Sequence, residues 1–330
     1  MNINRLIIQM DFLQNKNVKT FFYVLGLLWA AGKAFKILRA FYRTFIRRKR
    51  DLAARYGANS YAFVTGASDG IGKEFCRQLA LKNFNIILLA RNQKKLEEAA
   101  ADIKKVNPKI DVRIVAADLS KSYQDGFFDE IYNQVKDLDI SILINNAGVD
   151  CYDKFLDLDA EQLKNMIYIN CLPPVLLTKK LLPKIQARPK KGGVINVSSG
   201  AAIVPLAYYS TYTGTKALVD MFTRSIADEF PDIDIMSLKP FDVSTKMIYN
   251  REPDIMTITI EECVRGALND FGHQDGTYGH WKHKLQGALY EFVPRWLFNY
   301  VYFKLVAPDF FKEREEGRKK ELEQAAKKTQ

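Results

Sequence analysis

The feature that most constrains the fold of this chain is a series of six short apolar runs between Tyr61 and Leu238, separated by longer amphipathic stretches. The runs read YAFVTG, NIILLA, VRIVAAD, ISILINNAG, GVINVSS and IDIMSLKP. Each run is rich in β-branched residues and continuously hydrophobic, which is typical of strands buried on both faces of a helix-covered parallel sheet. The sequence therefore predicts an α/β fold with a doubly wound parallel sheet.

A glycine-rich stretch, Thr65-Gly-Ala-Ser-Asp-Gly-Ile-Gly72, follows the first run and leads into KEFCRQLALKN, which has the pattern of a helix. Its glycines allow a tight turn and close approach of the backbone to a pyrophosphate, and the helix N-terminus offers N–H groups to phosphate. This order predicts a Rossmann-like dinucleotide site, with an ordinary glycine turn as the alternative. The expected contacts are Thr65, Gly66, Ser68, Asp69, Gly70, Ile71, Gly72 and Lys73.

The end of the second run indicates which dinucleotide is bound. Arg91 stands there, where a cofactor with unmodified ribose hydroxyls would usually meet Asp or Glu. Arg91 and Lys73 together suit a 2′-phosphate, so the sequence favours NADP(H) over NAD(H), with a solvated arginine as the alternative. Asp118, after the third run, is expected to accept a hydrogen bond from the adenine amino group or to cap the following helix.

Positive charge is concentrated near the N-terminus. The 330 residues carry a formal net charge of +11, and no acidic residue lies between Asp11 and Asp51. That interval contains Lys16, Lys19, Lys33, Lys36, Arg39, Arg43, Arg47, Arg48, Lys49 and Arg50. From Lys33 to Arg50 the cations recur at helical spacing opposite aromatic and aliphatic residues, which predicts a basic amphipathic helix on an anionic membrane surface. A soluble helix packed on the domain is the alternative, and nucleic-acid binding is excluded because the apolar side suits lipid.

Both ends of the chain contain further membrane-like segments. The uncharged run of residues 20–32 would cover about 20 Å of a hydrocarbon core roughly 30 Å thick, which leaves open whether it spans the bilayer or lies in it. If it inserts, its basic flank keeps the following domain in the cytosol. Residues 285–311 are rich in aromatic residues and interrupted by Pro294 and Pro308. They predict a pair of interfacial helical pieces, or helices packed tightly on the domain.

Cysteine and histidine give no metal-binding pattern. The four cysteines are widely spaced and are expected to be reduced core thiols: Cys76, Cys151, Cys171 and Cys263. Only His273, His280 and His283 accompany them, so no metal site is expected. His280 and His283 are expected near the surface.

Five motifs occur in order along the middle of the chain: Thr65-Gly-x-x-x-Gly-x-Gly72, Asn145-Asn-Ala-Gly148, Asn170, Ser199 and Tyr212-x-x-x-Lys216. Together they resemble the short-chain dehydrogenase/reductase family over roughly residues 58–250. The four-residue spacing of Tyr212 and Lys216 places both on one helix face. There the ammonium favours ionisation of a phenol, whose ordinary pKa is near 10.

The family resemblance implies a role for each of these residues. Tyr212 would be the acid toward the carbonyl oxygen during reduction, and Lys216 would also contact the nicotinamide ribose. Ser199, rather than Ser198, would hold the carbonyl oxygen. Asn170 would anchor a water in a proton relay, with a plain helix residue as the alternative. The further cofactor contacts implied are Asn146, Ala147, Gly148, Tyr212, Lys216, Pro240, Val243 and Thr245.

A narrower resemblance rests on TGASDGIGK, on Phe241 in place of the family's usual glycine, and on the two membrane-like ends. These features resemble the membrane-bound very-long-chain 3-oxoacyl-CoA reductases, which are grouped with 17β-hydroxysteroid dehydrogenases. The resemblance implies NADPH-dependent reduction of the C3 ketone of a long acyl-CoA in fatty acid elongation. A steroid or retinoid ketone is the alternative substrate, and a non-catalytic NADPH-binding membrane scaffold is the alternative function.

The same resemblance implies an endoplasmic reticulum membrane protein with a cytosolic catalytic domain. Lys327 and Lys328 look like a dilysine retrieval signal, with a merely basic tail as the alternative. Membrane lipid and other elongation enzymes are the implied partners, and a homodimer would form through the helices that carry Asn170 and Tyr212.

The expected organisation has three parts. A membrane-associated helical segment covers residues 1–56, a reductase domain covers 57–284, and an interfacial helical segment with a basic tail covers 285–330. A substrate lid is expected at about residues 244–286. Tyr208 and Tyr209 lack partners at the required spacing and are expected to be aromatic walls near the substrate entrance.

Overall fold

The computed structural model describes residues 15–306, 308, 312 and 316, and the chain divides into two compact units between Lys49 and Arg50. In the first unit, α2 (Lys16–Phe41) continues into a π-helical turn, η1 (Tyr42–Ile46). The helix from Lys16 to Ile46 is long and apolar enough to cross a membrane, by length and composition. None of its residues is buried.

The C-terminal end of this helix corrects the predicted basic stripe. The backbone of Arg47 has φ −57° and ψ 131°, which lies outside the helical region, and the helix therefore ends at Ile46. Arg50 belongs to the second unit, where its side chain donates a hydrogen bond to His273. The sequence predicted a basic helical stripe that extends to Arg50. This prediction is wrong beyond Arg43, the last of these cations within the helix.

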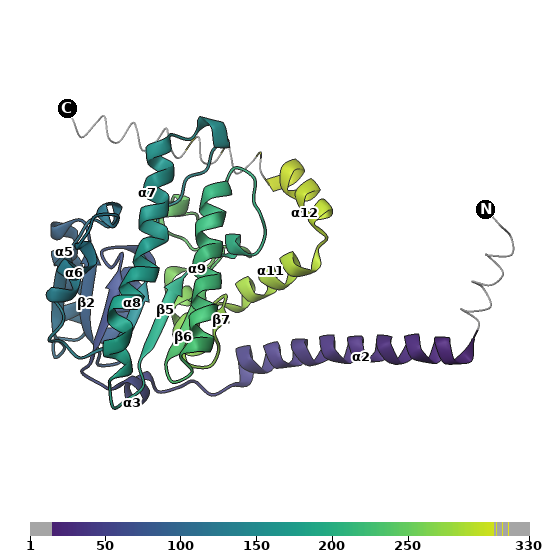
Figure 1. Ribbon diagram of the computed structural model, residues 1–330, viewed down its shortest axis with the longest axis horizontal. Helices are drawn as coiled ribbons and strands as arrows, with labels where there is room; N and C mark the ends of the chain where they lie inside the picture. The colour runs from purple at the N-terminus through teal and green to yellow at the C-terminus, as the bar shows by residue number, and fades with distance from the viewer. Residues whose placement is uncertain (1–14, 307, 309–311, 313–315, 317–330) are drawn as a thin grey trace. The chain divides into compact units, whose positions relative to one another are not determined.

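The second unit is built on a parallel sheet with the strand order β3-β2-β1-β4-β5-β6-β7 (Figure 1). Its strands are β1 (Tyr61–Thr65), β2 (Asn85–Ala90), β3 (Val112–Ala116), β4 (Ile140–Asn145), β5 (Gly193–Val197), β6 (Asp234–Leu238) and β7 (Gly276–Thr277). The first six lie within the six apolar runs, and β4 and β5 are buried at every position. This confirms the predicted doubly wound sheet; β7 is too short to leave a sequence pattern.

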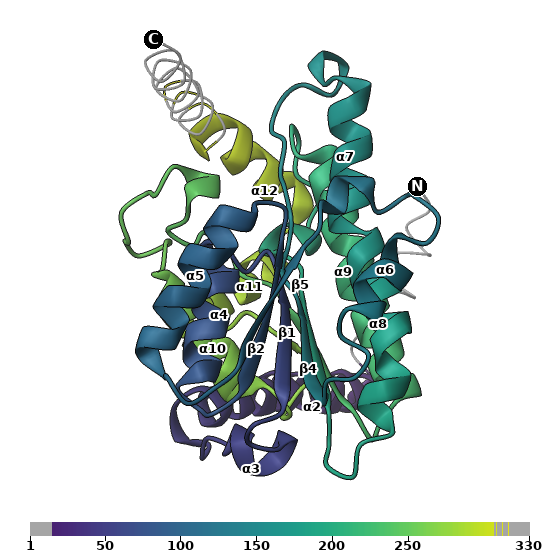
Figure 2. The same cartoon turned by 90° about the vertical axis from the view of Figure 1, so that its left-hand side faces the viewer.

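Helices cover both faces of the sheet (Figure 2). One face carries α4 (Gly70–Ala80), α5 (Gln93–Val106) and α10 (Ile260–Asp270), and the other carries α6 (Phe127–Asn133), α8 (Leu172–Gln186) and α9 (Ser210–Glu229). A separate apolar core lies under each helical layer. α7 (Ala160–Asn170) packs against α8 and α9.

The short helix α3 (Leu52–Tyr56) is part of the second unit. Leu52 and Tyr56 are 2% and 0% exposed, and the Tyr56 ring packs on Phe271 with centroids 5.0 Å apart. Arg55 and the Tyr56 hydroxyl both donate hydrogen bonds to Asp234, the first residue of β6. Residues 50–56, which the sequence grouped with the N-terminal segment, therefore belong to the sheet domain, and Leu52 and Tyr56 pack into its core.

The range expected as a lid contains both loop and core. A 3-10 turn, η5 (Lys246–Ile248), and an irregular segment come first, followed by α10, whose Cys263, Val264 and Ala267 are fully buried. Because α10 and β7 belong to the core, the candidate lid narrows to residues 245–256.

The C-terminal segment forms helical pieces, namely α11 (Trp281–Phe292), α12 (Arg295–Val301) and a π-helical turn, η6 (Tyr302–Val306). The break between α11 and α12 falls at Val293 and Pro294, as the proline predicts. Lys327 and Lys328 lie outside the described residues.

Candidate functional site

The glycine-rich loop joins β1 to α4 at the carboxyl edge of the sheet. Gly66 and Gly70 have φ of +65° and +54°, a region that favours glycine. A Cβ on Gly72 would lie 2.3 Å from the carbonyl oxygen of Gly66 and 2.5 Å from Nδ2 of Asn146. Bare backbone is therefore required here, as a pyrophosphate at the N-terminus of α4 would also require.

Thr65 ties this loop to the strand at the topological switch point. Its hydroxyl accepts hydrogen bonds from the backbone N–H groups of Asn146 and Ala147, at 2.9 and 3.0 Å. The Asn146 side chain in turn donates to the Thr65 carbonyl at 3.0 Å. Since β1 and β4 are neighbours in the sheet, these bonds bring the loop and Asn145-Asn-Ala-Gly148 together at the edge where doubly wound folds bind ligands.

Asn170 ends α7 and is 1% exposed. Its Oδ1 accepts from the N–H of Val149 at 2.8 Å, and its Nδ2 donates to the Val149 carbonyl and to the Thr215 hydroxyl. A Cβ on Gly148 would lie 3.2 Å from Nζ of Lys216 and 3.3 Å from Oδ1 of Asn170. Gly148 thus leaves room for an amide and an ammonium to approach the same point.

Tyr212 and Lys216 occupy one face of α9, as predicted. Nζ of Lys216 lies 5.7 Å from the centre of the Tyr212 ring and donates to the Val197 carbonyl at 3.0 Å. Lys216 is 4% exposed, and this burial lowers the pKa of its ammonium to about 8. The ammonium therefore remains the main form at neutral pH while lying close to a half-buried phenol.

The two serines after β5 have different environments. Ser198 is 2% exposed and donates to the Lys216 carbonyl at 2.6 Å. Ser199 is half-buried, and its hydroxyl oxygen accepts from the N–H of Ala201 at 3.1 Å. Because Ser198 is buried in a bond to the helix backbone, Ser199 is the serine with an accessible hydroxyl next to α9.

The segment after β6 is anchored by a histidine of α11 whose role the sequence did not predict. Phe241, in place of glycine, packs its ring over Gly200 and stacks on Tyr278 with centroids 5.8 Å apart. Its backbone N–H donates to Nδ1 of His283 at 3.2 Å. His283 is 0% exposed, so its expected position near the surface is wrong: its Nδ1 anchors this backbone from within the fold. No local pattern could have signalled a contact across 42 residues.

The remaining residues of this segment border the glycine loop. The Pro240 carbonyl accepts from the N–H of Gly200 at 2.8 Å. Val243 is 4% exposed and forms a bridge with Ile258, while the Thr245 methyl faces Gly70. The expected contact residues after β6 therefore do lie beside those after β1 and β5.

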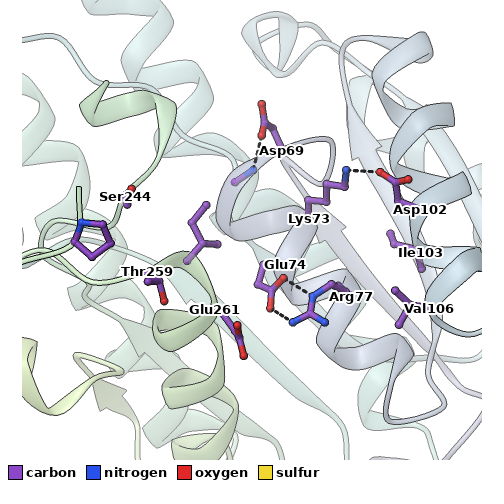
Figure 3. Close-up of a pocket in the computed structure, with 13 residues that line it drawn as sticks. Asp69, Lys73, Glu74, Arg77, Asp102, Ile103, Val106, Ser244, Thr259 and Glu261 are labelled. Atoms are coloured by element: carbon purple, nitrogen blue, oxygen red, sulfur yellow. Dashed lines mark hydrogen bonds and ion pairs between the residues drawn. The ribbon is translucent and has the colours of Figure 1, made fainter. Parts of the chain in front are cut away.

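The cations expected at a 2′-phosphate differ in their surroundings. Arg91 follows β2, is exposed, and has no hydrogen-bond or ion-pair partner within the part of the chain that the structure describes. Lys73 donates to Asp102 on α5 at 2.8 Å (Figure 3) and would have to leave this carboxylate to reach a phosphate. Asp118 caps the 3-10 turn η2 (Leu119–Lys121) by accepting from Ser120, which is the alternative that the sequence left open.

A cavity of about 620 Å³ adjoins the loop on its outer side (Figure 3). It lies between α4, α5 and the segment from Ser244 to Glu261, and Asp69 and Gly70 belong to both the loop and the cavity. Asp69 also pairs with Lys246 at the start of the candidate lid. This pair ties the candidate lid to the glycine loop, and Lys246 was not foreseen because it lies 177 residues away.

An aromatic cluster adjoins Tyr212. Its ring lies 5.4 Å from that of Tyr209, whose own ring lies 4.7 Å from Tyr152. The Tyr209 hydroxyl donates to Asp150 at 3.2 Å. Tyr208, held at φ +65°, lies 5.8 Å from Tyr152, ring to ring. Tyr208 and Tyr209 therefore pack with other rings, as expected of aromatic walls.

Comparisons with known proteins agree with this geometry. The family model described as short chain dehydrogenase matches residues 60–255. A 17-beta-hydroxysteroid dehydrogenase type 3 from Danio rerio is 33% identical over 264 residues, covering 77% of this chain and 84% of that protein. A very-long-chain 3-oxoacyl-CoA reductase from Rattus norvegicus is 32% identical over 281 residues, covering 83% of this chain and 86% of that protein.

Two solved structures share the fold. One, from work on 7beta-hydroxysteroid dehydrogenase stereoselectivity, has a TM-score of 0.66 at 23% identity and covers 74% of this chain and 95% of its own. The other is a short-chain dehydrogenase from Sphingobium yanoikuyae in complex with NADPH, with a TM-score of 0.61 at 24% identity, covering 72% of this chain and 97% of its own.

Proposed function

The chain belongs to the short-chain dehydrogenase family and is an oxidoreductase, and from this premise we propose that it reduces the C3 ketone of long- and very-long-chain 3-oxoacyl-CoA. The product is the 3-hydroxyacyl-CoA, and the reaction belongs to fatty acid elongation. The carrying observation is the half-buried Tyr212 with the buried ammonium of Lys216 close to its ring. The relatives named as very-long-chain 3-oxoacyl-CoA reductases support the choice of substrate.

Four residues have separate roles in the proposed reduction. NADPH, when bound, would supply the hydride for the carbonyl carbon. The Tyr212 hydroxyl donates its proton to the carbonyl oxygen, which the Ser199 hydroxyl holds by a second hydrogen bond. The Lys216 ammonium favours the phenolate that remains and would also hold the nicotinamide ribose. The phenolate regains a proton from the Lys216 ammonium, and Asn170, which bonds to Val149 and Thr215, would anchor the water that then returns a proton to Lys216.

A Tyr212→Phe variant tests this chemistry. It keeps the ring contacts with Tyr209 but removes the proton donor, so turnover should fall by at least about 10²-fold while NADPH binding is retained. Tyr209→Phe is the matched control, and its turnover should change little. Undiminished reduction by Tyr212→Phe would contradict the assignment of Tyr212 as the proton donor. A normally folded wild type that reduces no ketone would support the alternative of a non-catalytic scaffold.

The second candidate substrate is a 17β-oxosteroid or another lipid ketone. It is favoured by the similarity to a 17-beta-hydroxysteroid dehydrogenase type 3 over 77% of this chain. A panel of 3-oxoacyl-CoA thioesters and oxosteroids, assayed with the full chain in membranes, distinguishes the two. Activity toward steroids alone would end the acyl-CoA proposal.

NADPH is the proposed cofactor because Arg91, at the end of β2, is exposed and has no partner among the described residues, so it can meet a 2′-phosphate. Arg91→Asp should weaken NADPH relative to NADH by about 10-fold or more, since it replaces an attraction with a repulsion. Arg113→Asp, at an exposed position on β3, is the control. An unaltered cofactor ratio in Arg91→Asp would remove Arg91 from the site.

The proposed location is the endoplasmic reticulum membrane, with the catalytic unit in the cytosol, where the basic residues after α2 would keep it. Protease protection of the catalytic unit in sealed microsomes would contradict this orientation. The proposed homodimer forms through α7 and α9, which expose Ile167, Leu218 and Met221. Membrane lipid and other elongation enzymes are the further proposed partners.

A further inference from the structure

α11 has the reverse of the usual polarity of a surface helix. Trp281, Leu285 and Leu289 are 45%, 56% and 56% exposed, whereas His283 and Gln286 are 0% and 6% exposed. The exposed apolar residues recur every four positions and therefore form one stripe along the helix. A helix on the surface of a water-soluble domain would turn this stripe inward and its polar residues outward.

The helical pieces that follow also expose apolar residues. Trp296, Tyr300 and Phe303 are 72%, 62% and 45% exposed. Arg295 and Lys304, at the two ends of this stretch, are exposed and have no hydrogen-bond or ion-pair partner among the described residues. We call the six exposed apolar residues the docking face: Trp281, Leu285, Leu289, Trp296, Tyr300 and Phe303.

The candidate lid is fastened to the same helix. Lys282 donates to the Asp254 carbonyl at 2.7 Å, and Gln286 donates to the Met256 carbonyl at 2.8 Å. Between these two bonds, Ile255 is 79% exposed. The end of the candidate lid therefore adds apolar surface beside the stripe of α11.

A chain of aromatic rings leads from the docking face to the candidate acid. Phe303 lies 6.2 Å from Tyr208, ring to ring, and Tyr208 reaches Tyr212 through Tyr152 and Tyr209. Every member except Phe303 is at least partly buried. Packed aromatic rings therefore connect the docking face with Tyr212.

We propose that the docking face binds an anionic lipid bilayer and that the lipid substrate enters the site directly from that bilayer. Exposed tryptophan and tyrosine with adjacent cations is the composition found where a helix lies in the headgroup region. The chain also contains the candidate membrane-crossing helix Lys16–Ile46. Only residues 47–51 link this helix to α3, a reach of about 18 Å when fully extended, so a bilayer would always be near the catalytic unit.

Tryptophan fluorescence tests the docking step without substrate or cofactor. The chain has 3 Trp residues, so Trp29→Phe leaves only Trp281 and Trp296, both on the docking face. The full-length variant is reconstituted in vesicles of phosphatidylcholine and phosphatidylserine that contain acyl-brominated phosphatidylcholine. Quenching should be strongest for bromines near the top of the acyl chain, because interfacial helices insert about 5–10 Å.

Further substitutions are made in the Trp29→Phe variant. All of these variants retain α2, so any difference in quenching between them comes from the catalytic unit. Adding Leu285→Glu and Leu289→Glu should abolish most of the quenching, while Leu81→Glu with Tyr123→Glu, at exposed positions outside the docking face, should leave it unchanged. Thermal unfolding confirms that each variant is folded. Absence of quenching in the parent would overturn the proposal. If the parent showed no quenching and the two α11 substitutions dissociated a dimer, the docking face would bind a second copy of the chain instead of a bilayer.

Entry of the lipid substrate from the bilayer rests on the proposed function, and it is measured separately, through KM. In Leu285→Glu with Leu289→Glu, KM should rise for a long-chain ketone dissolved in the bilayer but stay unchanged for a short water-soluble ketone. An equal rise for both ketones would overturn entry from the bilayer. If the wild type reduces no ketone, the proposed function is wrong. The quenching experiment, which needs no substrate, still shows whether the docking face binds the bilayer.

Discussion

Gly72 is the residue at which the glycine-rich loop leaves the least room. The position of its missing Cβ is 2.3 Å from the Gly66 carbonyl oxygen, a backbone atom that cannot swing aside as a side chain can. The same point is 2.5 Å from Asn146, whose side chain holds the Thr65 carbonyl. A methyl group at Gly72 would therefore displace both the loop after β1 and the segment after β4.

Gly72→Ala should consequently weaken NADPH binding and lower the free energy of unfolding by about 1–3 kcal/mol, as overpacking does. Gly214→Ala is the matched control, because Gly214 lies in α9 with nothing within 4 Å of its missing Cβ. That change should raise stability by up to about 1 kcal/mol through helix propensity. Chemical unfolding and NADPH titration measure both effects, and normal cofactor affinity in Gly72→Ala would contradict the tight loop.

His283 influences the candidate site by holding the backbone of Phe241. Its Nδ1 fixes the N–H of Phe241, whose ring covers Gly200 directly after Ser199. Its Nε2 has no hydrogen-bond partner among the described residues. Burial lowers the pKa of this imidazole to about 4, so the neutral ring that accepts the bond from Phe241 persists well below neutral pH.

The pH dependence of stability should reveal this buried histidine. Between a folded-state pKa of about 4 and an unfolded value near 6.5, the unfolded chain binds more protons. Acidification through this window therefore lowers the free energy of unfolding, by at most about 1.4 kcal/mol per pH unit. His283→Asn retains an acceptor but cannot titrate, so its stability should fall less steeply from pH 6.5 to 4. Identical slopes for variant and wild type in chemical unfolding would contradict the assignment.

At the scale of elements, the sequence predicts best where one pattern determines the structure. β2 coincides with the run NIILLA, and α9 places Tyr212 and Lys216 together as their spacing requires. β7 and the Lys73–Asp102 pair were missed because neither leaves a local pattern: β7 depends on pairing with β6, and the ion pair joins α4 to α5. α10 was assigned to the lid because its sequence does not specify which surface buries its apolar face.

The docking of α3 on β6 depends on one carboxylate. Asp234 accepts hydrogen bonds from Arg55 and Tyr56, and its side chain is only 11% exposed. Burial alone would raise the pKa of Asp234, but these two donors outweigh burial and hold the pKa below its usual value. The carboxylate therefore stabilises the fold above the unfolded pKa of about 3.9, and this contribution is lost as pH falls.

Asp234→Asn should lower the free energy of unfolding at pH 7 by about 2–3 kcal/mol, since it weakens two bonds to a buried charge. The control is Glu161→Gln, because Glu161 pairs only with Lys164 among the described residues, where the side chains are 67% and 59% exposed. Exposed pairs contribute at most about 1 kcal/mol. Chemical unfolding compares the two variants, and equal losses would contradict the special position of Asp234. The deficit of Asp234→Asn should shrink below pH 4.

At the scale of the whole molecule, the division between Lys49 and Arg50 separates an unburied helix from a unit with an apolar core. Every residue of the helix Lys16–Ile46 is unburied by protein, whereas the catalytic unit has a core on each face of its sheet. The second unit therefore contains all the packing that the site requires. It begins at Arg50 rather than after Tyr56, because α3 contributes two buried side chains to that packing.

A chain shortened to residues 50–330 should consequently fold, bind NADPH and reduce a short water-soluble ketone. A chain that begins at Gly57 loses the burial of Leu52 and Tyr56, about 1.5–3 kcal/mol each, and leaves Asp234 without its two donors. Against a total stability of about 5–15 kcal/mol this is a large fraction, so the shorter chain should unfold at a much lower denaturant concentration. Comparing their unfolding midpoints measures the difference, and equal midpoints would mean that α3 belongs with the N-terminal helix. The 50–330 chain should still sediment with anionic vesicles, because the docking face stays with the catalytic unit when the helix is removed.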